Sequence, residues 1–252
     1  MSILITLRSA IAAVIFILIT IFWGILGIIL NIFFNRRRID SWIITTWGKQ
    51  SCGLFGVRIH LHNLDKMTEN LPKKQGAIVL FNHTSFIDVI AMAGYLNNVR
   101  FGSKIELFSI PIFGQAIRRF GTLPIARNNR EEVFKIYDEA KPRFARGERF
   151  ALSPEGGRFF GPELSKFKSG PFVFAINSQV PLVPVVIHNA NTAWSKQSIL
   201  PNTKAWVTDV NIYILDPIET TGLNVNERDV VIEKAYAVMN ACWKKNQSSR
   251  LQ

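Results

Sequence analysis

A histidine and an aspartate stand five positions apart in the segment FNHTSFID, residues 81–88, directly after the apolar run Ala77–Phe81. Such a run is typical of a buried strand, and Ser85–Leu96 has the pattern of a helix. His83 would then lie in the loop between them, and Asp88 in the first helical turn. The carboxylate could hold one ring nitrogen there and leave the other as a base, whereas on a continuous helix the two side chains would point about 140° apart.

The same residues permit a structural interpretation. Ser85 and Asp88 match a capping box, in which Asp88 serves only to cap the helix. A single histidine in a loop is also more often incidental than catalytic. The pair alone therefore leaves catalysis and helix capping open.

Three later segments bear on this question: GTLPIARNNR (121–130), LSPEGGRF (152–159) and VPLVPVVI (180–187). Each has an ordinary interpretation. Arg127 and Arg130 could be solvent-exposed charges. The Pro-Glu-Gly-Gly stretch could be a turn, and Val180–Ile187 could be core.

In this order and spacing the segments resemble the 1-acylglycerol-3-phosphate acyltransferases, a family of glycerolipid acyltransferases. The family's blocks are Asn-His-x-x-x-x-Asp, Gly…Arg, Pro-Glu-Gly-Thr-Arg and a Val-Pro-rich strand. They correspond to Asn82–Asp88, Gly121–Arg127, Pro154–Arg158 and Val180–Ile187. The stretch Ser103–Gly121 also resembles the family's Lys-x-Glu-Leu…Pro-x-x-Gly segment. One departure is Gly157, where the family has threonine.

The resemblance implies transfer of a fatty acyl group from a thioester to the sn-2 hydroxyl of 1-acylglycerol-3-phosphate, giving phosphatidic acid. His83 would be the general base and Asp88 would orient it, without an acyl-enzyme. Acyl-coenzyme A or acyl carrier protein would supply the acyl group as co-substrate, and no cofactor or metal is implied. His60 and His62 share a strand face but lack a third ligand nearby.

Further residues would bind the substrates. Arginine matches phosphate in geometry, so Arg127 and Arg158, with Lys104 and Arg130, would hold the acceptor phosphate. Glu155 would position an arginine or receive the acceptor hydroxyl. The loop N–H groups near Gly156 and Gly157 are one option for stabilising the oxyanion. The candidate substrate-binding residues are therefore Lys104, Arg127, Arg130, Glu155, Gly156, Gly157 and Arg158.

Composition favours work at a membrane. Of the 252 residues, 48% are hydrophobic and only 19% charged, and the formal net charge is +12. The positive charge suggests a polyanionic partner, and the hydrophobicity favours anionic lipid over nucleic acid. Membrane lipids, the lysophosphatidic acid acceptor and the acidic acyl donor are the expected partners.

The N-terminal segment predicts a membrane anchor. No charged residue occurs from Ser9 to Asn35, and three arginines, Arg36–Arg38, follow. A helix over these 27 residues would reach about 40 Å, against roughly 30 Å for a bilayer core. A second helix, about Asp40–Phe55, carries Trp42 and Trp47, which are typical of a membrane interface. Either the first helix crosses the bilayer, or both form a hairpin in one leaflet. The charge bias favours a catalytic domain on the cytoplasmic face.

The remaining chain alternates predicted strands and helices, which indicates an α/β fold with a mixed, largely buried sheet flanked by helices. Residues 1–56 form the predicted membrane-embedded two-helix segment, and residues 57–252 the acyltransferase domain. Predicted strands cover 57–62, 77–81, 149–152, 183–187 and 205–215, and predicted helices cover 85–96, 133–145, 172–177 and 228–245.

Two other functions remain compatible with these features. The acceptor could be another lysophospholipid or a lyso-aminolipid, or the chain could be a non-catalytic lipid-binding protein at the membrane surface. The pairing of His83 with Asp88 favours an enzyme, because binding alone needs no such pair.

Overall fold

The computed structural model describes residues 2–34, 37–68, 71, 76–126 and 129–248. Its helices are α1 (Ser2–Phe34), α2 (Arg37–Leu54), α3 (Asp65–Thr68), α4 (Phe86–Tyr95), α5 (Phe113–Arg119), α6 (Arg130–Phe144), α7 (Gly170–Ser178), α8 (Ala190–Ala193) and α9 (Arg228–Ser248), with 3-10 helices η1 (Ile105–Ser109) and η2 (Val225–Glu227). Its strands are β1 (Val57–His62), β2 (Ala77–Phe81), β3 (Val99–Lys104), β4 (Leu123–Ile125), β5 (Arg149–Leu152), β6 (Leu182–His188) and β7 (Thr208–Ile214).

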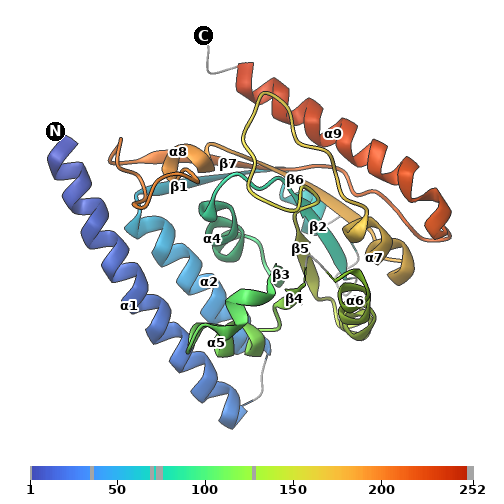
Figure 1. Cartoon of the computed structure of the whole chain (residues 1–252), viewed down its shortest axis with the longest axis horizontal. Helices are drawn as coiled ribbons and strands as arrows, with labels where there is room; N and C mark the ends of the chain where they lie inside the picture. Colours follow the sequence, from blue (N-terminus) through green and yellow to red (C-terminus); the bar gives the residue numbers. More distant parts are fainter. Residues whose placement is uncertain (1, 35–36, 69–70, 72–75, 127–128, 249–252) are drawn as a thin grey trace.

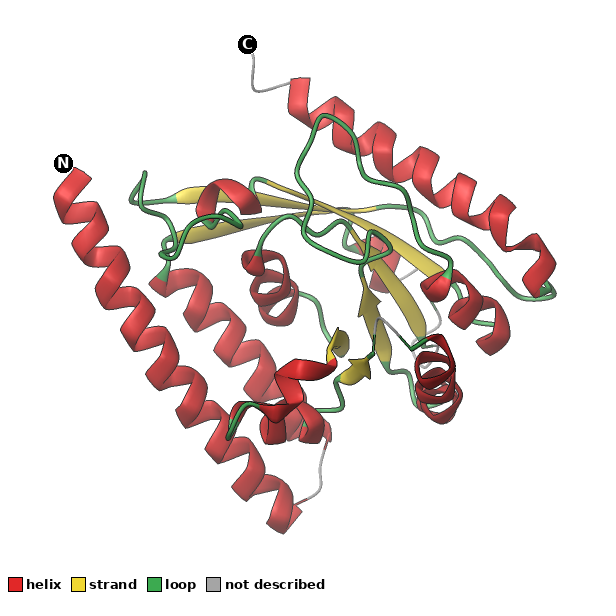
Figure 2. Ribbon diagram, in the orientation of Figure 1, coloured by secondary structure: helices red, strands yellow, loops and turns green. Residues whose placement is uncertain are grey.

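The strands form one seven-stranded sheet in the order β1-β7-β6-β2-β5-β3-β4 (Figures 1 and 2). All neighbouring strands run parallel except β6 and β7, which are antiparallel. The sheet is therefore mixed, as predicted. Strands β2 and β6 lie at its centre and are buried at every position, because helices cover both faces.

Two helical layers enclose the sheet. Ala77, Val79 and Phe81 of β2 point into a core shared with α2 and α4, which also includes residues of α1 and α8. Ile78 and Leu80 point to the other face, where α6, α7 and α9 pack. This alternation along a single strand, with a core on each side, is why its sequence is continuously apolar.

The first two helices pack on the α/β domain. Helix α2 approaches α4 through Gly48 and Gly94, where a Cβ on Gly48 would stand 2.4 Å from the Gly94 nitrogen. Only glycine permits so close an approach of two backbones. Helix α1 lies beside α2 and α5 along one side of the molecule (Figure 1). The N-terminal helices thus support the helix that carries Asp88.

Most predicted elements are present, and their ends differ by a few residues. The helix predicted over 133–145 starts earlier, at Arg130. The strand predicted to begin at Ala205 begins at Thr208, and Trp206 lies in the preceding loop. Strands β3 and β4 and helix α5 were missed because they are short or contain charged residues and glycine, which obscure the periodicity. The domain boundary at residues 56 and 57 remains a prediction.

Candidate active site

His83 lies at the carboxyl edge of the sheet, two residues after the end of β2. Asn82, between them, is fully buried. Its side-chain amide donates to the carbonyl oxygen of Ile187 (3.0 Å), and its side-chain oxygen accepts from the Ile187 N–H (2.7 Å). These two bonds extend the pairing of β2 with β6 by one residue and fix the point from which the His83 loop departs.

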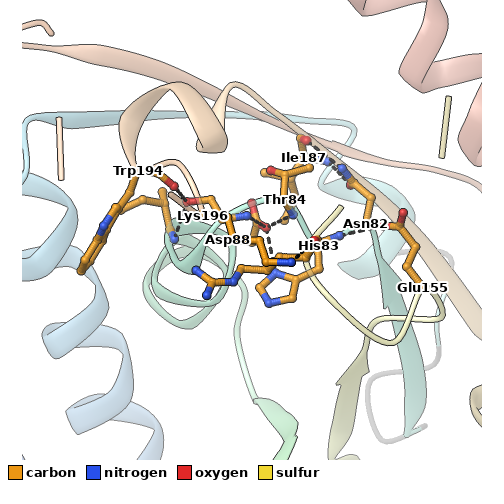
Figure 3. Close-up of polar contacts among 11 residues, drawn as sticks. Asn82, His83, Thr84, Asp88, Glu155, Ile187, Trp194 and Lys196 are labelled. Atoms are coloured by element: carbon orange, nitrogen blue, oxygen red, sulfur yellow. Dashed lines mark hydrogen bonds and ion pairs between the residues drawn. The ribbon is translucent and has the colours of Figure 1, made fainter. Parts of the chain in front are cut away.

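Asp88 holds the ring of His83 and caps α4 with the same oxygen atom (Figure 3). Its Oδ2 lies 3.0 Å from His83 Nδ1 and accepts the main-chain N–H groups of Thr84 (2.7 Å) and Ser85 (2.8 Å). Ser85 is the N-cap, and its hydroxyl accepts from the Ile87 N–H. Asp88 therefore has both of the roles that the sequence left open, because it orients His83 and caps α4 at the same time.

This geometry suits a base. With its Nδ1–H donated to the carboxylate, the imidazole keeps a lone pair on Nε2. The His83 side chain is 17% exposed, whereas Asp88 is fully buried. The Phe81 ring also packs against the imidazole at an interplanar angle of 65°, with the centroids 5.6 Å apart. The ring is therefore held on two sides and open on a third.

The segment after β5 forms hydrogen bonds with both the N–H and the carbonyl oxygen of His83. Glu155 Oε1 accepts the His83 N–H (3.0 Å), and the Phe159 N–H donates to the His83 carbonyl oxygen (2.8 Å). Glu155 Oε2 accepts the N–H and the hydroxyl of Ser165, both at 3.0 Å. The carboxylate thus joins two parts of the loop between β5 and α7 to the main chain of His83, and Figure 3 shows Glu155 beside His83.

Glu155 is only 3% exposed and is not among the residues that line the cavity described below. Burial raises the pKa of its carboxyl above the usual value, and the hydrogen bonds from His83 and Ser165 partly oppose that shift. Both carboxylate oxygens have partners within the protein. These contacts favour a role in holding the loops, and substrate contact by Glu155 remains an untested prediction.

His83 forms part of the wall of a cavity of about 770 Å³. The cavity extends from α1 and α2 to α6 and the start of α7, and most of its lining is apolar or aromatic. Among the described residues that line it there is no acidic side chain, whereas Lys104, Arg158 and Lys168 are cationic. This composition suits a ligand with a long apolar part and an anionic group.

Lys168 is a cavity residue that the sequence interpretation missed. Its N–H donates to the Pro154 carbonyl oxygen (2.8 Å), and its side chain lies over Gly156, where a Cβ would stand 2.9 Å from Nζ. Gly156 has a φ of +72°, a backbone conformation that favours glycine. Lys168 and Gly156 are 12 residues apart in the chain, and this spacing does not indicate a contact. Only the fold of the loop brings Lys168 back to the turn at Gly156.

The glycine at position 157 has a visible consequence. A Cβ there would stand 3.2 Å from the ring of Phe159, so the absence of a side chain leaves room for that ring. Lys196, another residue missed in the sequence, lies over the same ring, 6.0 Å from its centroid, and donates to the Arg158 carbonyl oxygen (3.4 Å). Gly157 therefore makes room for Phe159, and Lys196 packs on the same aromatic ring.

Two predicted phosphate-binding residues, Arg127 and Arg130, and the two histidines not assigned to the site, His60 and His62, complete the comparison with the sequence. Arg127 lies outside the described residues. Arg130 begins α6, and its side chain lies outside the described part of the chain. His60 contacts Asp209 (2.7 Å), and His62 contacts a side-chain oxygen of strand β7 (2.9 Å).

Comparisons with known proteins agree with the motifs. Residues 60–188 match the family described as Acyltransferase, which is about half of the chain. The chain belongs to this acyltransferase family.

Two curated relatives are similar over most of the chain. A 1-acyl-sn-glycerol-3-phosphate acyltransferase of Saccharomyces cerevisiae is 26% identical over 84% of this chain and 69% of its own. The human 1-acyl-sn-glycerol-3-phosphate acyltransferase beta is 26% identical over 82% of this chain and 73% of its own. Other relatives match over a smaller part of their length. The chloroplastic enzyme LPAT1 of Arabidopsis thaliana is 29% identical, and the match covers 60% of this chain and 42% of that protein.

A solved structure shares the fold. The crystal structure of the 1-acyl-sn-glycerophosphate (LPA) acyltransferase PlsC from Thermotoga maritima superposes with a TM-score of 0.78. It is 21% identical in sequence, and the match covers 98% of this chain and 96% of that one. The mixed sheet and its flanking helices are therefore an architecture that a known protein adopts.

Proposed function

We propose that the protein transfers a fatty acyl group from an acyl thioester to the sn-2 hydroxyl of 1-acylglycerol-3-phosphate, giving phosphatidic acid. The single observation that carries this proposal is that His83, bonded to Asp88, lies in the wall of an apolar cavity whose charged lining residues, among those the structure describes, are cations. The names of the relatives support the same reaction.

The reaction needs one base and no covalent enzyme intermediate. Nε2 of His83 takes the proton of the acceptor hydroxyl while its oxygen attacks the thioester carbonyl carbon. The imidazolium that forms is stabilised by Asp88 through Nδ1. The tetrahedral intermediate then collapses, the carbon–sulfur bond breaks, and the departing thiolate takes the proton back from His83. Acyl-coenzyme A and acyl carrier protein both present such a thioester.

The cavity provides for both parts of the acceptor. Its apolar lining suits an acyl chain, and Arg158 with Lys104 and Lys168 offers cations for a phosphate monoester. Arg158 lies between Glu155 and Phe159, which both form hydrogen bonds with the main chain of His83. The proposed phosphate contact and the base are therefore held by the same loop.

Helix α1 is proposed to lie within one leaflet rather than to cross the bilayer. Among the described residues it is the one helix that is apolar and long enough to span. Both of its ends, however, are bonded to the domain. Ser9 donates to Asn202 at one end, and Arg119 donates to the Asn31 carbonyl oxygen at the other. These contacts lie about 33 Å apart along the helix, so a crossing would place the domain on both sides of a core roughly 30 Å thick.

The catalytic domain is proposed to face the cytoplasm, because the cytoplasmic leaflet is anionic and attracts basic clusters such as the arginines at 36–38. Arg8, on the other side of the apolar stretch, bonds to carbonyl oxygens of the domain. Its guanidinium is therefore engaged within the protein, and the arginines at 36–38 are the basic cluster on which this orientation rests.

The test is a lysolipid panel. Purified protein in detergent receives lysophosphatidic acid, lysophosphatidylcholine, lysophosphatidylethanolamine or a lyso-aminolipid, with acyl-coenzyme A or acyl carrier protein as donor. We expect phosphatidic acid as the preferred product. Acylation of another lysolipid in preference would keep the mechanism and change the acceptor, and no transfer to any lysolipid would indicate a lipid-binding protein.

A substitution tests the phosphate contact. Replacing Arg158 by Ala should raise the KM for lysophosphatidic acid roughly ten- to hundredfold, since a charge-assisted hydrogen bond contributes about 1.5–3 kcal/mol. The exposed Lys234 on α9 provides a control, because Lys234→Ala removes a positive charge without touching the cavity. An equal KM in both variants would show that Arg158 does not bind the phosphate.

A further inference from the structure

The loop between α8 and β7 carries a group of exposed apolar side chains, including the most exposed large hydrophobic residue among the described ones. Ile199 is 90% exposed, Trp206 is 49% exposed and Val207 is 47% exposed. Lys196 and Lys204 in the same loop are also exposed. Apolar and aromatic side chains interspersed with lysines are typical of a membrane–water interface.

This loop is fastened to the N-terminal end of α1. Arg8 donates to the carbonyl oxygens of Asn202 (3.1 Å), Ala205 (3.2 Å) and Trp206, and its guanidinium lies 5.1 Å from the centroid of the Trp206 ring. The Ser9 hydroxyl also donates to Asn202. Figure 1 shows the loop after α8 beside the start of α1. The loop therefore has a fixed position against the helix.

The exposed face of α1 is apolar along the whole helix. From Leu4 through Ile17 and Phe22 to Ile32, its exposed residues are large hydrophobic ones, with Thr6 the exception. A groove of about 400 Å³ on this helix begins beside the loop. Its lining includes Arg8 and the side chains Leu4, Leu7, Ile11, Ile15 and Leu54. Arg8 thus lines the apolar groove and also bonds to the loop. The loop is therefore continuous with the exposed surface of α1.

We propose that the loop from Lys196 to Val207 is a further membrane contact, which inserts Ile199 and Trp206 into the interface of the same leaflet as α1. The occupant is an anionic lipid surface, because the exposed charged side chains of the loop are lysines. The proposal rests on the placement of α1 in one leaflet. Its consequence is that the hydrogen bonds from Arg8 to the loop fix the orientation of the domain relative to the membrane as well as the path of the loop.

The proposal is tested by site-specific fluorescence in vesicles. A Cys242→Ser background leaves Cys52, which is fully buried, as the remaining native cysteine. Ile199→Cys is labelled with nitrobenzoxadiazole, and Phe22→Cys on α1 provides the positive control. Val230→Cys provides the matched negative control. Val230 is 69% exposed on α9, whose packing is on the opposite face of the sheet (Figure 1).

Each labelled protein is reconstituted into phosphatidylcholine–phosphatidylglycerol vesicles with and without doxyl-labelled phosphatidylcholine. We expect roughly twofold or greater quenching at residue 199 relative to residue 230, close to the quenching at residue 22. Equal quenching at 199 and 230, with strong quenching at 22, would overturn the loop contact and leave the placement of α1 intact. Weak quenching at 22 would overturn the placement of α1 and this proposal together.

Discussion

At the residue scale, one carboxylate oxygen accounts for the five-residue offset between histidine and aspartate. Asp88 Oδ2 accepts from the two main-chain N–H groups that begin α4 and from the ring of His83. The sequence predicts this pair because the two residues are only five positions apart, on either side of the start of α4. It could not predict Lys168 or the partners of Glu155, because those contacts depend on how the loop between β5 and α7 folds back on itself and packs against the His83 loop.

Two substitutions separate orientation of the base from capping of the helix. Asp88→Asn removes the negative charge that stabilises the imidazolium of His83, so we expect transfer to fall roughly 10²–10⁴-fold. Ser85→Ala removes only the N-cap hydroxyl and should lower the free energy of unfolding by about 1 kcal/mol, with a much smaller effect on rate. Initial rates and thermal unfolding in detergent measure both effects. Equal loss of rate in the two variants would mean that Asp88 acts only as a cap.

The raised pKa of Glu155 should make the stability of the folded protein depend on pH. Burial raises the pKa of its carboxyl in the folded protein above the usual 4.5. The folded state therefore holds the proton to higher pH than the unfolded state, and the stability present below pH 4.5 is lost as pH rises through the raised pKa. In Glu155→Gln this loss should be absent, so the difference in unfolding free energy between wild type and variant should change with pH.

The control for Glu155 is a carboxylate with the opposite shift. Hydrogen bonding and charge from Lys244 hold the pKa of the exposed Glu163 below its usual value. Glu163→Gln should keep the decline that wild type shows above pH 4.5. Unfolding in detergent, followed from pH 4 to 8, makes the comparison, and an unchanged profile in Glu155→Gln would contradict the assignment.

At the element scale, close helix packing positions the site. The sequence predicts α2 and α4 from their periodicity, but not that Gly48 and Gly94 bring their backbones together. That contact joins elements distant in the chain, and a glycine in a helix is not by itself a packing signal. The order of the strands was equally unpredictable, since β3 and β4 carry weak patterns.

Two glycines of the same helix test this packing. A Cβ on Gly48 would stand 2.4 Å from the Gly94 nitrogen, whereas Gly53 has nothing within 4 Å. Gly48→Ala should therefore lower the unfolding free energy by about 1–3 kcal/mol and displace the helix that carries Asp88. Gly53→Ala should be neutral or stabilising by up to about 1 kcal/mol. Thermal unfolding midpoints compare the two, and equal midpoints would contradict a tight α2–α4 contact.

At the scale of the whole molecule, the apolar N-terminal helix and the net charge of +12 point to an anionic membrane. The sequence predicts the anchor from length and hydrophobicity. It leaves open whether α1 crosses the bilayer, because that depends on contacts at both helix ends, which only the fold provides.

The positive charge should govern how fast the protein reaches a membrane. Binding to vesicles that contain phosphatidylglycerol should be faster than binding to pure phosphatidylcholine, and roughly 1 M salt should remove the difference because it shortens the Debye length to about 3 Å. Binding to neutral vesicles should persist, since the face of α1 is apolar. Stopped-flow light scattering measures both, and a salt-independent rate would contradict electrostatic attraction.

The central claim is that His83 is the base for acyl transfer to lysophosphatidic acid. The most direct measurement compares phosphatidic acid formation by wild type and His83→Ala, with acceptor affinity measured in parallel. We predict turnover by wild type and a loss of roughly 10²–10⁴-fold in the variant, with acceptor affinity unchanged. Equal rates in the two proteins would contradict the assignment of His83 as the base.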